Sequence, residues 1–379
     1  METLNTPFVY GKIAAGNDFT DREADSLRLK QNLTGGINTI LISPRRWGKS
    51  SLVYKTAKQM QRQKNIVFCF IDLFNVRSEQ EFYEIFAREL IKISASKWDE
   101  RVAQGKKFFK KIIPRFSVGL DPNNEFSISL DWNEIKKAPE EILNLAENIC
   151  KSKKIKIVVC IDEFQNIAYF SDHVAFQKKL RANWQHHHLT TYCLFGSKRH
   201  LLMHLFTSPS MPFYKFGDTM FLQKIELNYW VDFIVKRFKD TGKNIKKEHA
   251  SHIAQLMENH PYFVQQMAQT IWQISGKNCT NSAIDEALDK LMIQHSILFQ
   301  REIDQLTNMQ INFLKALCEG IIQFSAKENL DNYKLGTSAN VIRIKDALES
   351  KEIIDLMGNK IEFIDPLFKH WLTKIYFIK

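Results

Sequence analysis

The chain has 379 residues, of which 44% are hydrophobic, and a formal net charge of +11. This length and composition exclude a disordered protein and a small disulfide scaffold, and they suffice for two or three domains with their own cores. No apolar run reaches the roughly 18 residues of a membrane helix, and the six cysteines include no C-x-x-C pair. We therefore expect a cytoplasmic protein with reduced cysteines and no membrane contact.

The most informative stretch follows an apolar strand expected at residues 39–42. It reads Ser43-Pro44-Arg45-Arg46-Trp47-Gly48-Lys49-Ser50-Ser51 and leads into a helix expected at 50–63. A loop of this kind wraps its N–H groups around phosphates, while Lys49 reaches the β/γ oxygens and the Ser50 hydroxyl ligates Mg²⁺. The pattern predicts a phosphate-binding loop for a nucleoside triphosphate.

One position departs from the usual pattern G-x-x-x-x-G-K-[ST], because Ser43 stands where the first Gly is expected. Ser43 can still make the turn if its backbone keeps ordinary dihedral angles. Gly48 retains the conformational freedom where the backbone comes closest to phosphate.

A second motif lies about a hundred residues downstream, where a β-branched run at 155–161 is typical of a buried parallel strand. It ends in Asp162-Glu163-Phe164-Gln165, which is typical of a Walker B strand. Asp162 is expected to hold the Mg²⁺ shell, and Glu163 to orient or deprotonate the attacking water. Two acids after a strand are weak evidence alone, but behind a Gly-Lys-Ser loop they favour nucleotide binding strongly.

Strand patterns at residues 39–42, 67–72, 155–161, 191–195 and 220–225 alternate with helical patterns at 50–63, 79–94 and 173–185. This alternation predicts a parallel, doubly wound α/β sheet with helices on both faces. The run His186-His187-His188 has no acidic or Cys partner spaced to close a metal site, so we expect a solvated loop there.

A basic window interrupts the α/β pattern, with seven Lys or Arg against two acids between residues 97 and 115. A β-hairpin is expected directly after it, at 116–120 and 126–130 around Asp121-Pro122-Asn123-Asn124. Together they form an insertion at about 97–135. It is either a cover for the nucleotide or a partner, or a solvated decoration, and a solvated helix face is the more common reading of such a run.

Helical periodicity takes over after residue 227, with helices expected at 229–240, 248–258, 262–275 and 281–304. This is the pattern of a small helical lid. Helices at 309–320 and 338–351, with a turn at 333–336, then precede a hairpin at 353–357 and 360–364 around Gly358-Asn359. Two helices and a two-stranded wing predict a winged helix-turn-helix. The expected domains are a P-loop core at 1–227, a lid at 228–305 and a winged helix at 306–379.

An ordered set of motifs resembles the archaeal-type ATPase family, of the STAND-related branch of AAA-like P-loop ATPases. The motifs run from Phe19-Thr20-Asp21-Arg22-Glu23 through the two described above to Phe195-Gly196-Ser197-Lys198, His260-Pro261-Tyr262 and Asp365-Pro366-Leu367-Phe368. The resemblance extends over nearly the whole chain except the insertion. It implies that Arg22 frames the nucleotide pocket, that Ser197 is the polar sensor, and that Pro261 packs near the base. It leaves an arginine finger open, since Tyr214-Lys215-Phe216-Gly217 stands where relatives often carry Tyr-Gly-Arg, and Arg181, Arg199 and Lys215 remain alternatives.

Two functions follow from these motifs. The first is a Mg²⁺-dependent ATPase that acts as a nucleotide-driven switch or motor, with a protein partner at the lid or winged helix and an oligomer as a further option. The second is an ATP-dependent DNA-binding regulator with slow or structural nucleotide use. Residues 306–379 hold ten Lys or Arg against nine Asp or Glu, and so nearly neutral a module favours the first.

Overall fold

The computed structural model describes residues 6–14, 16–61, 65–94, 116–120, 126–358 and 360–378. The chain packs into two compact units. We call the first the helical unit, composed of Met1–Asp21, Arg46–Gly48 and Gln223–Lys379, and the second the sheet unit, composed of Arg22–Arg45 and Lys49–Leu222. The division into a core, a lid and a winged helix stays a prediction.

The sheet unit is built on five parallel strands in the order β2-β5-β6-β1-β7. They are β1 (Thr39–Ile42), β2 (Ile66–Asp72), β5 (Lys156–Asp162), β6 (Thr190–Gly196) and β7 (Asp218–Phe221). Every residue of β1 and β6 is buried, as a parallel sheet covered on both faces requires. The predicted parallel α/β sheet is therefore confirmed.

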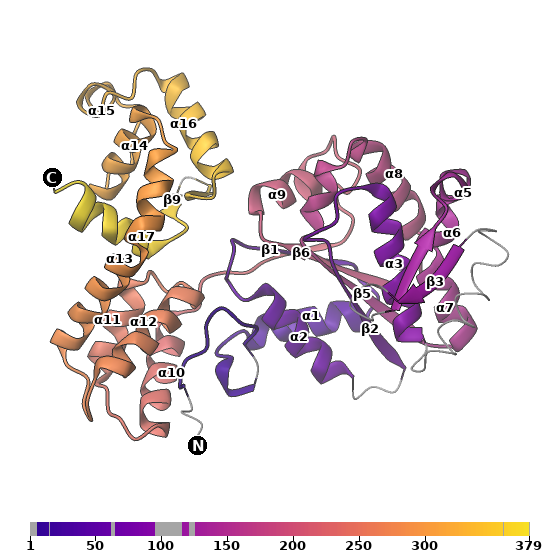
Figure 1. The fold of residues 1–379 in the computed structure, drawn as a ribbon, viewed down its shortest axis with the longest axis horizontal. Helices are drawn as coiled ribbons and strands as arrows, with labels where there is room; N and C mark the ends of the chain where they lie inside the picture. Colours follow the sequence, from indigo (N-terminus) through magenta and orange to yellow (C-terminus); the bar gives the residue numbers. More distant parts are fainter. Residues whose placement is uncertain are drawn as a thin grey trace. The chain divides into compact units, whose positions relative to one another are not determined.

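Helices cover both faces of this sheet, and Figure 1 shows α1 and α2 on the side opposite α8 and α9. The larger helices are α1 (Glu23–Thr34), α2 (Lys49–Met60), α3 (Glu79–Ser94), α7 (Leu145–Lys153), α8 (His173–Trp184) and α9 (Arg199–Thr207). Shorter helices are α5 (Trp132–Lys137), α6 (Pro139–Leu143) and the 3₁₀ segment η2 (Phe164–Tyr169). Aromatic side chains fill the face under α3 and α8, where the Trp184 and Tyr192 rings stack with centroids 4.1 Å apart.

The insertion is described only in part. Strands β3 (Phe116–Leu120) and β4 (Phe126–Leu130) pair antiparallel, from Phe116 with Leu130 to Leu120 with Phe126, so the predicted hairpin is confirmed in its strands. The basic window at 97–115 and the turn at 121–125 lie outside the described residues.

One strand prediction was shifted. Strand β7 is Asp218–Phe221, whereas the sequence pattern favoured 220–225. Gly217 lies so close to the preceding chain that a Cβ there would be 2.1 Å from the Asn38 carbonyl oxygen. This contact and the hydrogen bond from Asp218 N to Asn38 O, at 2.8 Å, start the strand early.

The helical unit contains four long helices, α10 (Leu227–Asp240), α11 (Lys247–Leu256), α12 (Pro261–Ile274) and α13 (Asn281–Asp304). Its N-terminal segment, which includes the 3₁₀ turn η1 (Gly16–Asp18), packs against them. Phe8 is buried against Phe233 and Phe238, at ring-centroid distances of 6.0 and 5.8 Å. The Gln269 side chain accepts a hydrogen bond from Phe8 N at 3.2 Å.

The last part of the helical unit forms the winged helix, shown in yellow and orange in Figure 1. It contains α14 (Asn308–Cys318), α15 (Lys327–Asn332), α16 (Ser338–Ser350), β8 (Ile354–Met357), β9 (Lys360–Phe363), α17 (Pro366–Trp371) and the π-helical turn η3 (Leu372–Tyr376). Thr307 and Gln310 form a capping box that starts α14. The predicted helices and wing are confirmed, whereas α15 and α17 were not predicted. No helix in the described part of the chain is long and apolar enough to cross a membrane.

Helix α17 begins at a buried acid, and this leads to a prediction about pH. Asp365 accepts hydrogen bonds from Leu367 N at 2.8 Å and Phe368 N at 3.0 Å. Burial raises the pKa of this carboxyl to about 7; the two backbone donors and Arg46 oppose the rise, and Glu302 adds to it.

Because the pKa of Asp365 is higher in the folded chain than in the unfolded chain, its stabilising contribution is present at low pH and is lost as the pH rises through about 7. We expect hydrogen exchange of the α17 amides to speed up over this range, after correction for the intrinsic pH dependence. The Asp365→Asn protein keeps an oxygen acceptor without the charge and should lose this dependence. Equal pH profiles for both proteins would contradict the prediction.

Candidate functional site

Several of the predicted site residues of the sheet unit lie where three neighbouring strands end. Strands β1 and β6 are in register from Thr39 with Cys193 to Ile42 with Gly196, and β5 pairs with the other side of β6. Parallel strands place their carboxyl ends at one edge, which is where ligands bind in open α/β sheets. The loop after β1 and the acids at the end of β5 therefore meet at this edge.

Lys49 is the first residue of α2 and is buried, with 6% of its surface exposed. Its ammonium donates to Ser43 O at 2.9 Å, Ser43 Oγ at 3.3 Å and Pro44 O at 2.8 Å. The loop is thus closed on its own lysine by three oxygen acceptors. Ser43 has no left-handed backbone, whereas Gly48 has a φ of +91°, as expected for both positions.

Ser50 and Asp162 lie side by side although they are 112 residues apart in the chain, with Ser50 Oγ donating to Asp162 Oδ2 at 2.8 Å. Burial raises the pKa of Asp162 to about 6; the Ser50 hydroxyl, the Glu163 amide and Lys49 oppose the rise, and the Glu163 carboxylate adds to it. A hydroxyl beside a carboxylate supplies the hard oxygen ligands that Mg²⁺ prefers.

Glu163 is held by Ser197 at the end of β6. Its Oε2 accepts from Ser197 Oγ at 2.9 Å and from Ser197 N at 3.2 Å. Gln165 donates to the same oxygen. Glu163 has a left-handed backbone with a φ of 51°, and its hydrogen bonds with Ser197 place its carboxylate at the end of β6.

Gln165 was missed as a site residue, since an amide two positions after an acid carries no recognisable signal. The packing depends on Gly196, where a Cβ would meet Gln165 Oε1 at 1.8 Å. The glycine therefore makes room for the side chain that, with Ser197, fixes Glu163.

The tip of the phosphate loop packs within the helical unit. Arg46 has a φ of 64°, and its guanidinium carbon lies 4.4 Å from the centroid of the Tyr262 ring. Trp47 is buried and meets His260 edge to face, with centroids 6.2 Å apart. Arg45, which precedes Arg46 in the chain, is exposed.

The remaining predicted residues lie at the starts of three helices. Ser51 is buried in the first turn of α2. Arg22 precedes α1 with a φ of 74°, and its guanidinium donates to Asp25 at 3.2 Å. Pro261 is the first residue of α12, beside His260, whose side chain caps the helix by accepting from Tyr262 N. The roles of all these residues in binding nucleotide remain predictions.

In the histidine run, His186 and His188 are exposed, as expected for a solvated loop, but His187 is not. His187 is half buried, and its two ring nitrogens hydrogen-bond Tyr192 OH at 2.9 Å and Asn144 Oδ1 at 2.8 Å. Burial lowers its pKa to about 4, so His187 is a neutral structural residue. Among the residues that the structure describes, no cluster of His, Cys, Asp and Glu could hold a metal ion by itself.

Comparisons with known proteins agree with this architecture. Residues 297–374 match the family model described as "Probable winged helix domain". The Walker-type ATPase Paby2304 of Pyrococcus abyssi is similar over 95% of this chain and 97% of its own, with a TM-score of 0.64 and 17% identity. The Aeropyrum pernix ORC2 protein, in ADPNP and ADP complexes, is similar over 99% of this chain and 98% of its own, with a TM-score of 0.54 and 13% identity.

The chain has the fold of a P-loop ATPase with a C-terminal winged helix domain. The Aeropyrum pernix ORC1 protein in complex with DNA shares it over 96% of this chain and 94% of its own, with a TM-score of 0.50 and 10% identity. No curated protein sequence matches the chain. At these identities the likeness concerns the fold, so the chemistry of this P-loop ATPase fold has to be argued from its own residues.

The donor set fits a nucleotide with Mg²⁺. Lys49 holds three loop oxygens that a phosphate would replace as its partners, and the Ser50 hydroxyl already points at the Asp162 carboxylate. The buried Gln165 Oε1 has no hydrogen-bond partner among the described residues. An unsatisfied acceptor next to Glu163 is a place for an ordered water.

Proposed function

We propose that this chain binds ATP with Mg²⁺ and hydrolyses it, as a nucleotide-driven switch or motor whose winged helix engages a partner. The observation that carries the proposal is the linked set Lys49, Ser50, Asp162, Glu163 and Ser197 at one sheet edge. A cation for the phosphates, two oxygen ligands for the metal and a carboxylate for the water are the parts that phosphoryl transfer to water needs.

Each residue has a task that its position supports. Lys49, released from the loop oxygens, binds the β- and γ-phosphates. Ser50 and Asp162 would hold Mg²⁺, which when bound supplies charge neutralisation for the phosphates. Glu163 orients a water and accepts its proton, and Ser197 sets the direction of the Glu163 carboxylate through two hydrogen bonds. The loop N–H groups around Gly48 cradle the phosphates.

The test is Mg²⁺-dependent release of phosphate from ATP by the purified chain, measured with and without chelator. A further measurement addresses the switch. A pull-down with the Glu163→Gln protein, held in its ATP-bound state, should retain the partner better than the nucleotide-free protein. Phosphate release at the level of the buffer control, over hours, would argue against an ATPase.

The finer assignments rest on the resemblance and belong to the same proposal. We infer that the chain is a STAND-related, archaeal-type ATPase and that Arg22 and Pro261 lie near the nucleotide. Arg45 is exposed, so it is available to bind a phosphate or to contact a second subunit. The arginine finger stays open among Arg181, Arg199 and Lys215. Among these, Arg181 lies over the Phe216 ring at 5.1 Å, and burial lowers its pKa.

DNA binding is the second candidate, and the ORC1 structure in complex with DNA favours it. The exposed face of α16 argues against it, because Ile342 is 61% exposed there beside Arg343 and Asp346. An apolar residue and one charge of each sign form a poor surface for phosphates. DNA binding therefore rests on the basic window more than on the wing.

Changing Lys106, Lys107, Lys110 and Lys111 together to Glu separates the two functions. If these residues contact DNA, affinity should fall steeply with salt, by about 0.9 log units per log unit of salt for each phosphate contact, and the quadruple variant should abolish binding. We expect the opposite, with little change in either DNA binding or ATP turnover, as measured by fluorescence anisotropy and phosphate release. Loss of DNA affinity alone would reverse the ranking of the two functions.

A further inference from the structure

No strand of the described residues pairs with the outer edge of the wing. Strand β9 pairs with β8 in a two-stranded sheet, and Ile364 N donates to Ile353 O at 3.0 Å just beyond it. In an antiparallel pair, hydrogen-bonded and non-hydrogen-bonded positions alternate. Ile361 and Phe363 are therefore in non-hydrogen-bonded positions, and their N–H and C=O groups face away from β8.

A pocket of about 770 Å³ runs along this edge. Lys360, Ile361, Glu362 and Phe363 all line it, although alternate side chains of a strand lie on opposite faces. The pocket thus follows the edge of β9 rather than one face of the hairpin. Residues 320–322 and Phe324, which follow α14, also line it. A volume of this size is within the range of ligand sites. A third strand would lie roughly 4.7–4.9 Å from β9, the usual spacing of neighbouring strands in a sheet.

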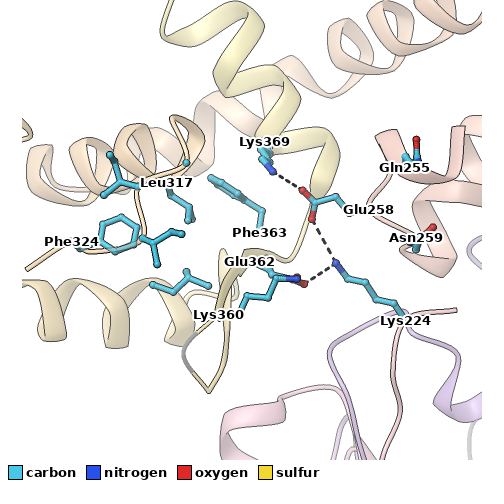
Figure 2. Close-up of a pocket in the computed structure, with 14 residues that line it drawn as sticks. Lys224, Gln255, Glu258, Asn259, Leu317, Phe324, Lys360, Glu362, Phe363 and Lys369 are labelled. Atoms are coloured by element: carbon cyan, nitrogen blue, oxygen red, sulfur yellow. Dashed lines mark hydrogen bonds and ion pairs between the residues drawn. The ribbon is translucent and has the colours of Figure 1, made fainter. Parts of the chain in front are cut away.

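One side of the pocket is apolar. Figure 2 shows Leu317 and Phe324 on the same side as Phe363. Ile321 and Ile361 complete this wall, and Ile322, at the rim, is 84% exposed. An apolar side chain of a ligand that covered Ile322 would remove apolar surface from water, and this burial would stabilise the complex.

The other side carries an ion-pair network, drawn with dashed lines in Figure 2. Glu258 pairs with Lys369 at 2.7 Å and Lys224 at 3.6 Å, and Glu362 pairs with Lys224 at 2.7 Å and with Lys360. Burial opposes the charge of Glu362, but Lys224 and Lys360 hold the pKa of its carboxyl below the ordinary value.

Charge in this network favours an acidic ligand. Three lysines face two carboxylates, and each carboxylate is already shared by two ammonium groups. Lys360, whose side chain is 73% exposed, and Lys369 each have one carboxylate partner and further N–H donors to offer. A nucleic acid would meet the same two carboxylates and an apolar wall, which its phosphates cannot use.

We propose that the β9 edge binds an extended segment of a partner protein as a third strand, with alternating apolar and acidic side chains. The outward N–H and C=O groups of Ile361 and Phe363 supply main-chain hydrogen bonds. Apolar side chains fill the wall at Leu317, Phe324 and Phe363, and acidic ones meet Lys360 and Lys369. Strand addition of this kind takes affinity from the main chain and specificity from alternate pockets. The inference rests on the proposed role of the winged helix as a partner module, but it does not depend on ATP hydrolysis.

The test uses the full chain and a fluorescein-labelled probe peptide, Glu-Leu-Asp-Val-Glu-Leu-Asp-Val, in fluorescence anisotropy. Two matched peptides are controls, one with Lys in place of every acid and one with N-methyl groups on alternate amides. We expect the probe to bind at least about tenfold more tightly than either control, since one removes the charge match and the other the main-chain hydrogen bonds. Equal affinity for the three peptides, or no binding of the probe at millimolar concentration, would overturn the proposal.

Variants of the protein locate the site. Ile361→Pro removes the outward N–H of residue 361 and leaves the hydrogen bonds to β8 intact, and edge strands tolerate proline at such positions. Ile361→Val keeps the N–H and is the matched control. Lys360→Glu reverses an exposed charge at the pocket, and Arg343→Glu reverses one on α16. We expect about tenfold weaker binding for Ile361→Pro and Lys360→Glu, with near wild-type binding for both controls.

Circular dichroism tests whether each variant is folded. If the Ile361→Pro protein is unfolded, the Lys360→Glu protein decides the result. The Lys49→Ala protein should bind the peptide as wild type does, so an inactive ATPase and an absent peptide site give different results. Wild-type affinity in the Lys360→Glu protein, or displacement of the peptide by a duplex oligonucleotide, would overturn the proposal.

Discussion

The Lys49→Ala protein should lose ATP affinity by about thirtyfold or more, because removing one member of a close charge pair costs roughly 2–5 kcal/mol. The reason lies in the loop. Lys49 is the cation that three loop oxygens hold, at 2.8 to 3.3 Å. Calorimetric titration with ATP and Mg²⁺ measures the effect.

The fold should survive this change. The ammonium contacts loop carbonyls rather than the apolar core, and the neighbouring Gly48 and Ser50 are partly exposed, so that water can take over its hydrogen bonds. Lys58→Ala, on the exposed side of the same helix, is the matched control and should bind ATP normally. Undiminished affinity in the Lys49→Ala protein would contradict the phosphate-loop assignment.

The Glu163→Gln protein should bind ATP normally and hydrolyse it about a hundredfold or more slowly, the usual cost of losing a general base. The amide keeps an oxygen that can accept from Ser197 N and Ser197 Oγ, as Glu163 Oε2 does at 3.2 and 2.9 Å. The side chain therefore stays in place, but it cannot accept a proton from water.

Single-turnover phosphate release, with ATP binding measured in parallel, tests this expectation. Glu140→Gln, an exposed acid at the start of α6, serves as control and should turn over like wild type. Turnover of the Glu163→Gln protein at the wild-type rate would mean that Glu163 is a structural cap before η2.

Local patterns predicted most of the fold. The helices at 79–94 and 281–304 have the bounds that the periodicity indicated, since each combines a long apolar face with clear end signals. No helix was predicted at α1, α5, α7 or α9, and the short helices α6, α15 and α17 were also missed. They have five or six residues each, too few for periodicity, and α17 depends on the enclosed cap at Asp365.

The tip of the phosphate loop shows the limit of motif reasoning. Three partners remained open for Arg45 and Arg46: the nucleotide, an acid of a neighbouring element, and a second subunit. Arg46 lies over the Tyr262 ring and close enough to Asp365 to oppose the rise of its pKa. A ring face 216 positions further along the chain carries no sequence signal, because cation–π contact depends on geometry and not on spacing.

The motifs alone identify the parts suited to the function: the Gly-Lys-Ser loop, the two acids after an apolar strand and the wing at the C-terminal end. These follow from residue type and short spacing, which set hydrogen-bonding capacity and local periodicity. The partners of each residue, in contrast, follow from the folded arrangement of the chain. The order of the parallel strands brought Ser50 to Asp162 and Ser197 to Glu163, and the packing around β9 left one strand edge beside a pocket. Such pairings join residues tens to hundreds of positions apart, because backbone hydrogen bonds and side-chain packing are satisfied in space rather than along the chain.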